Sequence, residues 1–162
     1  MHNLPTTFRD AMSLIPTSVS ILACVSDSKI YSCTISSLVS VDVSEESAQI
    51  IFVLKKKSFV GSKIVANNDF TISVLNSSQT PLAKQYSSQR NSEDLLSENW
   101  HTSADRFTQL KDARVVLKCK FECVYKAHKA DIFVGNVLDF DVKSELNSLI
   151  YDSRRYGMFG IE

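Results

Sequence analysis

The sequence predicts a mainly β protein, an antiparallel barrel with short helices at its periphery. Seven segments have the alternating or β-branched composition of strands, whereas only three have helical features. The helical segments do not alternate regularly with the strands, which argues against a parallel α/β sheet. An antiparallel barrel is the architecture that such a set of strands favours.

The N-terminal half begins with a short helix. Thr6 or Thr7 is suited to cap it, Phe8 and Met12 lie on one side, and Pro16 ends it. The expected elements are, in order, a helix at 7–14, strands at 17–25 and 30–37 joined by a turn at 26–29, a strand at 48–54 and a helix at 58–66. Because the 48–54 run is almost wholly apolar, we expect this strand to be covered on both faces.

The C-terminal half contains the longest strand candidates. The expected elements are a strand at 70–75, a helix at 79–86, strands at 113–125 and 131–142 joined by a loop at 126–130, a strand at 149–151 and a turn-rich tail at 152–157. The polar segment 87–112 contains the only tryptophan, Trp100, and has weak periodicity. We expect this segment to cross the surface as a long excursion, in the manner of a lid.

Composition limits the classes of function. The 162 residues suit a single domain, 1–162, and Lys+Arg and Asp+Glu balance at 18 each, which argues against nucleic acid or anionic membrane as partner. No apolar run reaches the roughly 18 residues of a membrane span, and the N-terminus lacks the features of a signal peptide. We therefore expect a cytoplasmic protein with its four cysteines reduced and no metal site, since no CxxC pair occurs.

A row of hydroxyl side chains is the most unusual feature of the sequence. In "YSCTISSLVSVDV", Ser32, Thr34 and Ser36 share one parity and therefore one face of an extended strand. The alternation then changes phase at Ser37, which indicates a bend or a bulge. Such a row faces the core, the solvent or a polar ligand.

Five motifs in the same order resemble the FMN-binding split-barrel flavin reductases, which include the reductase components of two-component flavin monooxygenases. The resemblance covers nearly the whole chain. The motifs are "FRDAMSLIPTSVSIL", "TISSLVSVDVSEESAQIIFVLKKKS", "FTISVLNSSQTPLAKQYS", "DIFVGNVLDFDV" and "LIYDSRRYG". This resemblance implies a split β-barrel, a Greek-key-like antiparallel barrel with short peripheral helices.

The resemblance also implies a set of flavin-binding residues. Thr34, Ser36 and Ser37 fall on the family's flavin-contacting positions, where hydroxyls suit the ribityl chain and phosphate of FMN. Lys57 and Ser58 fall on its basic-Ser pair, and a lysine beside a capped helix N-terminus suits the phosphate. The alternatives are a solvent-facing strand for the hydroxyls and a solvated charge run for the lysines.

Three residues are candidates for the nicotinamide side of the site. His128 lies two residues before Ala130, the position at which the family commonly has a histidine. Arg155 and Tyr156 belong to the closing motif, which in the family lies near the cleft and the partner subunit. Their alternatives are an ordinary loop histidine and a basic surface turn.

The implied activity is that of an NAD(P)H:flavin oxidoreductase that transfers hydride from nicotinamide C4 to flavin N5. The cofactor is FMN, with FAD as the alternative, and NADH or NADPH is the co-substrate. Because the flavin performs the chemistry, no catalytic residue is predicted. The family further implies a homodimer and an oxygenase component as partner.

Two other classes of function remain open. The absence of the family histidine at Ala130 leaves a non-catalytic FMN-binding store, carrier or sensor on the same barrel. If the resemblance is set aside, the Ser-rich strand is a binding edge of a small β-barrel interaction module.

Overall fold

The computed structural model describes residues 4–44, 46–87, 91–95, 97–105 and 107–159. The helices are α1 (Leu4–Ser13), α2 (Phe59–Asn67), the 3-10 turn η1 (Ser77–Gln79) and α3 (Thr80–Gln85). The strands are β1 (Thr17–Ser18), β2 (Ser20–Ser26), β3 (Lys29–Ile35), β4 (Val39–Val43), β5 (Ala48–Lys55), β6 (Asp69–Val74), β7 (Asn91–Asp94), β8 (Trp100–Thr102), β9 (Thr108–Leu110), β10 (Val115–Lys126), β11 (Ala130–Val142), β12 (Leu149–Asp152) and β13 (Arg155–Met158). A mainly β fold with short helices is thus confirmed.

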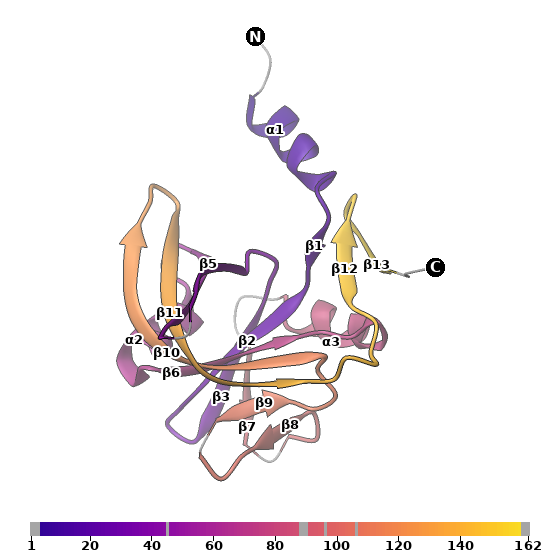
Figure 1. Cartoon of the computed structure of the whole chain (residues 1–162). Helices are drawn as coiled ribbons and strands as arrows, with labels where there is room; N and C mark the ends of the chain where they lie inside the picture. Colours follow the sequence, from indigo (N-terminus) through magenta and orange to yellow (C-terminus); the bar gives the residue numbers. More distant parts are fainter. Residues whose placement is uncertain (1–3, 45, 88–90, 96, 106, 160–162) are drawn as a thin grey trace.

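One strongly curved antiparallel sheet organises the chain (Figure 1). Its strand order is β4-β5-β11-β10-β6-β2-β3-β7, and the long β10–β11 hairpin forms its middle. β1, β12 and β13 form a second sheet, and β8 and β9 pair with each other. β2 pairs with β3, its neighbour in sequence, on one side and with β6, which is distant in sequence, on the other. The sheet therefore depends on non-local strand pairing.

Two hydrophobic clusters lie on opposite faces of β2 and β3. Leu22 and Cys24 face the first, together with Val60 and Ile64 of α2, whereas Ile21 and Ala23 face the second, together with Ala83 of α3. This division follows from the alternation of side chains along a strand. The two short helices therefore cover opposite faces of the same hairpin.

Gly61 allows α2 to approach the sheet closely. A Cβ at this position would lie 2.8 Å from Cζ of Phe133 and 3.2 Å from Cδ1 of Leu54. Phe133 is itself buried and stacked on Phe52, with ring centroids 5.3 Å apart. The absence of a side chain at Gly61 thus sets where the N-terminus of α2 lies.

The segment 87–112 differs from its expectation as a surface excursion. Its described residues form β7, which pairs with β3, and the β8–β9 hairpin. Trp100 and Leu110 are only 3% and 1% exposed and belong to the second cluster. The weak periodicity arose because strands of three or four residues are too short to show alternation, and the partner of β7 is the distant strand β3.

Other expectations also need correction. The tail after Asp152 was expected to consist of turns, but Arg155–Met158 forms a strand that pairs with β12. Val39–Val43 forms the additional edge strand β4, beside β5. β5 buries Ile50, Phe52 and Leu54 on one face, but its other face is open, with Val53 39% exposed, so β5 is not covered on both faces within one chain.

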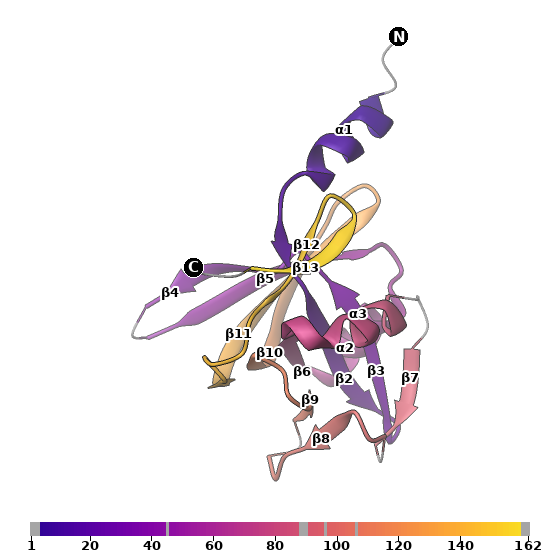
Figure 2. The ribbon, with the colours of Figure 1, turned by 90° about the vertical axis from the view of Figure 1, so that its right-hand side faces the viewer.

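Helix α1 stands apart from the sheet in two views (Figures 1 and 2). Phe8 and Met12 are exposed, and contacts with the rest of the chain include the Ser153 N–H donating to the Ser13 carbonyl and an ion pair of Arg154 with Asp10. Within the described ranges, no helix is both long and apolar enough to cross a membrane.

Candidate functional site

A pocket of about 540 Å³ lies where β3, β5 and α2 converge. Residues 33–37, residues 53–60 and Ser87 line it. Its volume falls within the roughly 300–1,000 Å³ of typical small-molecule sites. All five residues predicted to bind flavin, Thr34, Ser36, Ser37, Lys57 and Ser58, line this one pocket.

The hydroxyl groups on the β3 side differ in the hydrogen bonds open to them. Thr34 Oγ1 donates to the Ala83 carbonyl at 2.7 Å, so this hydroxyl has only its lone pairs left for a ligand. Ser37 Oγ is bonded to both the N–H and the carbonyl of Val53. Ser36 is exposed to the pocket and has no hydrogen-bond partner in the described part of the chain. Ser36 is therefore the hydroxyl that is free to donate.

Ser32 departs from the expectation that the whole row faces one ligand. It is 1% exposed, and its Oγ is buried without a hydrogen-bond partner among the described residues. The strand places Ser32 opposite Ala23, on the side of the second cluster, and Ser32 does not line the pocket. The polar wall of the pocket thus begins at Thr34.

The opposite end of the pocket is basic and ends at a helix N-terminus. Ser58 caps α2, its Oγ accepting from the Gly61 N–H at 3.3 Å. The remaining N–H groups of the first turn have no acceptor within the helix and, together with the helix dipole, favour an anion. Lys57 has a left-handed backbone, with φ of 62°, which directs the chain sharply from β5 into α2.

The lysines of this turn have different roles. Lys56 Nζ donates to the carbonyls of Ala127 and His128, both at 3.4 Å, and the Lys56 N–H donates to the Lys129 carbonyl at 3.1 Å. Lys56 therefore ties the turn to the tip of the β10–β11 hairpin. Lys57 is exposed and makes no ion pair with any described residue, so its charge is available to a ligand.

The inner wall of the pocket is apolar. Ile35, Leu54 and Val60 are buried behind the polar rim, and Phe59 is partly exposed beside it. Cys33 belongs to this wall, and burial raises the pKa of its thiol to about 12. The thiol is therefore protonated at neutral pH and is no nucleophile. The pocket offers an apolar surface, hydroxyls and an anion seat, but no evident acid–base pair.

The three residues predicted for the nicotinamide side do not line this pocket. His128 lies in the hairpin loop and is exposed, and its contact with the site is the Lys56 bond to its carbonyl. Arg155 is exposed on β13, and the Tyr156 ring packs on Tyr151 at 5.1 Å. Ala130 pairs with Lys55 at the pocket edge. The roles of His128, Arg155 and Tyr156 stay predictions.

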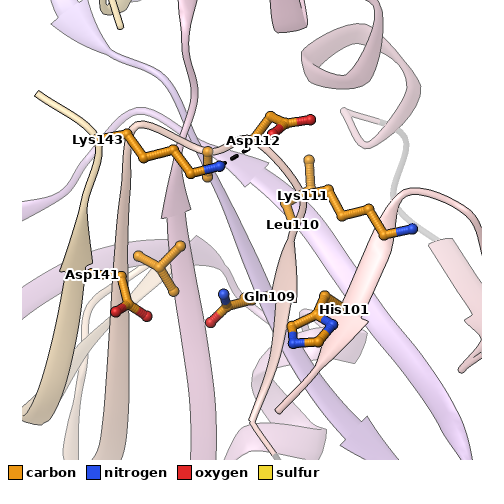
Figure 3. A pocket seen from close by; sticks show the side chains of 9 residues that line it. His101, Gln109, Leu110, Lys111, Asp112, Asp141 and Lys143 are labelled. Carbon is orange, nitrogen blue, oxygen red and sulfur yellow. Dashed lines mark hydrogen bonds and ion pairs between the residues drawn. The ribbon is translucent and has the colours of Figure 1, made fainter. Parts of the chain in front are cut away.

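A second pocket, of about 240 Å³, lies near the far end of β11 (Figure 3). Lys143 bonds Asp112 across its upper side, while Asp141, Gln109 and His101 lie along its lower side. It is less than half the size of the first pocket and contains none of the predicted site residues. The described residues also include no group of three or more His, Cys, Asp or Glu that could hold a metal ion.

Sequence reasoning missed several residues of the site. Cys33, Phe59 and Ser87 line the pocket without a recognisable motif. The bond of Lys56 to the hairpin tip was also not foreseeable, because its partners are 71 and 72 residues away. The only available signal was the three-lysine run itself, which does not tell one lysine from the next.

Comparisons with known proteins agree on one family. The model of the flavin reductase like domain matches residues 12–160. The reductase component of an FADH(2)-dependent resorcinol hydroxylase from Rhizobium sp. (strain MTP-10005) is 23% identical over 152 residues, which cover 92% of this chain and 84% of that protein. The match to the family confirms the resemblance that the five motifs indicated.

Solved structures share the fold. BorF, the flavin reductase component of a bacterial two-component tryptophan halogenase, superposes with a TM-score of 0.87 at 21% identity, covering 98% of this chain and 99% of its own. The NADH:FAD oxidoreductase SgcE6 of Streptomyces globisporus C-1027 gives 0.86 at 19% identity, with coverage of 98% and 94%. Another structure of SgcE6 is a complex with NAD and FAD fragments, with a TM-score of 0.85 at 19% identity and coverage of 96% and 93%.

Proposed function

Because the chain belongs to the flavin reductase-like domain family, we propose that it is an NAD(P)H:flavin oxidoreductase that uses FMN and supplies reduced flavin to a partner oxygenase. The observation that carries the proposal is the convergence of Thr34, Ser36, Ser37, Lys57 and Ser58 in one pocket of suitable size. These residues come from two segments that are about 20 positions apart, and the motifs of both segments predict the same ligand.

The chemistry of the pocket fits a phosphorylated flavin. Lys57, the Ser58 hydroxyl and the first-turn N–H groups of α2 would hold the phosphate. Ser36 would donate a hydrogen bond to the ribityl chain. The Thr34 hydroxyl, which already donates to the Ala83 carbonyl, would accept a hydrogen bond from it. The apolar wall behind them suits an aromatic ring system.

A bound flavin would supply the hydride-accepting ring, with the nicotinamide nucleotide as donor. The task of this chain is to hold and orient the two ligands, which explains why the pocket needs no nucleophile. The thiol of Cys33 stays protonated, and the hydroxyls of Thr34 and Ser37 are fixed by backbone carbonyls. The pocket walls are therefore chemically inert and sterically defined.

The oxygenase partner is proposed from the relatives. One relative is the reductase component of an FADH(2)-dependent resorcinol hydroxylase, and BorF is the flavin reductase component of a two-component tryptophan halogenase. The SgcE6 relative is an NADH:FAD oxidoreductase, which makes FAD the alternative flavin for this chain. The pocket opens to solvent beside the exposed Lys57, so the adenosine end of FAD could extend outward without displacing a buried residue.

A homodimer would cover apolar side chains that the sheet leaves exposed. Val53 is exposed on the face of β5 that points away from the first cluster. Leu138, Phe140 and Val142 are exposed near the end of β11, where the strand is bulged and Phe140 pairs with Leu117, on the other face of the sheet. In Figure 2 the β4–β5 edge extends away from α3, and α1 also projects from the body. Soluble monomers rarely expose so many large apolar side chains on strands, which favours a second copy as the cover.

The first experiment is an absorbance titration of the purified protein with FMN, followed by NADH or NADPH without oxygen. The proposal predicts flavin bands that shift on binding and bleach when the nicotinamide is added. Bound bands that persist with both nucleotides would instead favour the store, carrier or sensor that the missing histidine at Ala130 left open. A protein that does not bind flavin at all would refute both.

A further inference from the structure

Thr34 lies beyond the end of ordinary strand pairing on its side of β3. β7 pairs with β3 only as far as Ser32. At Thr34 the exposed edge is instead satisfied by the end of α3, because the Thr34 N–H donates to the Tyr86 carbonyl at 2.9 Å and its Oγ1 donates to the Ala83 carbonyl at 2.7 Å. The position of this pocket residue thus depends on where α3 ends.

Helix α3 needs an external anchor. It has only six residues, and isolated helices of that length are not stable. Its two inward residues near the C-terminus are Ala83 and Tyr86, both 0% exposed. Tyr86 closes the helix, its N–H donating to the Leu82 carbonyl at 3.0 Å. The Tyr86 side chain is therefore the principal anchor of this end of α3.

Two residues of the following segment hold the Tyr86 side chain. Trp100 Nε1 donates to Tyr86 Oη at 3.1 Å and to Glu93 Oε2 at 3.0 Å, and the Tyr86 and Trp100 rings meet edge to face at 5.6 Å. Burial, and then the hydrogen bond to the Glu93 carboxylate, raises the pKa of Tyr86 to about 12. Ring, indole and carboxylate thus form one cluster, in which Asn99 also bonds the Tyr86 hydroxyl and Gln85 and Ser97 bond the Glu93 carboxylate.

We propose that Tyr86, Glu93 and Trp100 act together as positioning residues that hold Thr34 in the flavin pocket without touching the flavin. The inference rests on the proposed function, since it assumes that Thr34 contacts the flavin. It gives the segment 91–100 a role in affinity for flavin, which neither its sequence nor its distance along the chain from Thr34 suggests. A change in the three groups should therefore alter flavin binding more than it alters the chemical step.

The test compares Tyr86→Phe and Glu93→Gln with Thr102→Val. Thr102 lies two residues after Trp100, and its hydroxyl is bonded to the Thr108 hydroxyl at 2.9 Å and not to the three proposed groups, which makes it the matched control. The dissociation constant for FMN is measured by titration, the melting temperature is measured without flavin, and KM and kcat are measured with varied flavin. We expect the first two variants to raise the dissociation constant and KM about tenfold while kcat at saturating flavin is kept, and the control to stay within about twofold.

A double-mutant cycle separates positioning from a general loss of stability. If Tyr86 acts through Thr34, adding Tyr86→Phe to Thr34→Val should weaken FMN binding no further than Thr34→Val alone. Independent, multiplicative losses would overturn the inference, as would variants that bind FMN like the wild type. If Tyr86→Phe does not fold, the same cycle is run with Glu93→Gln, whose side chain is only half-buried.

The outcomes distinguish this inference from the proposed function. Wild-type protein that does not bind FMN would overturn both. Wild-type protein that binds FMN, with Tyr86→Phe and Glu93→Gln unaffected, would overturn the positioning role alone. Loss of affinity in these variants, with non-additivity at Thr34, is the result expected if the three groups hold the pocket wall.

Discussion

The Ser37 hydroxyl links to the backbone of Val53 in both directions. It accepts from the Val53 N–H at 2.9 Å and donates to the Val53 carbonyl at 3.3 Å. β3 ends at Ile35 and β4 begins at Val39, so a side chain here completes the pairing that a strand backbone would otherwise provide. This explains the change of phase in "YSCTISSLVSVDV": Ser37 secures the crossing to β5, and Ser36 is turned toward the pocket.

Neighbouring serines should therefore respond differently to substitution. Ser37→Ala removes both bonds to Val53 and should lower the free energy of unfolding by about 1 kcal/mol, measured by urea denaturation. Ser36→Ala should leave stability unchanged and weaken FMN binding about fivefold, because its hydroxyl is free for the ligand. Equal stability losses in the two variants would contradict this division of roles.

Lys57→Asn should weaken the binding of FMN about tenfold at low salt. Asn removes the charge but tolerates the left-handed backbone of this position, so the turn should be kept. Riboflavin, which has no phosphate, should bind the variant and the wild type equally. The control is Lys29→Gln, an exposed lysine outside the pocket. Parallel losses for FMN and riboflavin would show that Lys57 does not act on the phosphate.

Gly61→Ala should destabilise the protein and weaken FMN binding. The added Cβ would lie 2.8 Å from the buried Phe133 ring, which is stacked and cannot swing aside. Overpacking of this kind costs about 1–3 kcal/mol and should outweigh the roughly 1 kcal/mol by which alanine favours a helix over glycine. Gly157→Ala, with no atom within 4 Å of the added Cβ, should change neither quantity. Calorimetry and an FMN titration measure the two effects.

Lys118→Met should make the free energy of unfolding less dependent on pH in the acid range. Lys118 is 8% exposed and lies 3.0 Å from Asp139 and 3.1 Å from Asp105. Its bond lowers the pKa of Asp139, and bonds from Ser103 and then Lys118 lower the pKa of Asp105.

Groups with a depressed folded pKa contribute stability above the unfolded value of about 3.9, and this stability is lost as pH falls through the folded pKa. The free energy of unfolding, measured from about pH 6 down to about pH 3, should therefore fall more steeply in the wild type than in Lys118→Met. Parallel declines would indicate that the two ion pairs contribute nothing to stability.

Phe140→Glu should shift the protein from dimer to monomer. Phe140 is 62% exposed near the end of β11, between the exposed Leu138 and Val142, and a charge buried there by a second copy would oppose association. Val65→Glu, at an exposed position on α2 and not on β11, is the control. Sedimentation velocity at several concentrations measures the mass, and a wild-type protein that is monomeric throughout would refute the homodimer.

Much of the fold was predictable because long antiparallel strands show their alternation locally. Strands expected at 113–125 and 131–142 are observed as Val115–Lys126 and Ala130–Val142. The strands that escaped prediction, such as Arg155–Met158 and Trp100–Thr102, are short and polar. They are strands because a neighbouring strand of the same hairpin pairs with them, and three or four residues are too few to show the alternation from which a strand is predicted.

The sequence by itself determined the class of fold, the family and the two segments that meet in the pocket, because these depend on periodicity and on the order of short motifs. The tertiary structure decided which hydrogen-bonding groups are already bonded within the protein and which are free for a ligand. The Thr34 hydroxyl donates to the Ala83 carbonyl, the Lys56 ammonium donates to the tip of the β10–β11 hairpin, and the Trp100 indole N–H donates to Tyr86 and Glu93. The reason is physical: a hydrogen-bonding group is committed by whatever partner folding places within about 3 Å of it, and that partner is usually distant in sequence.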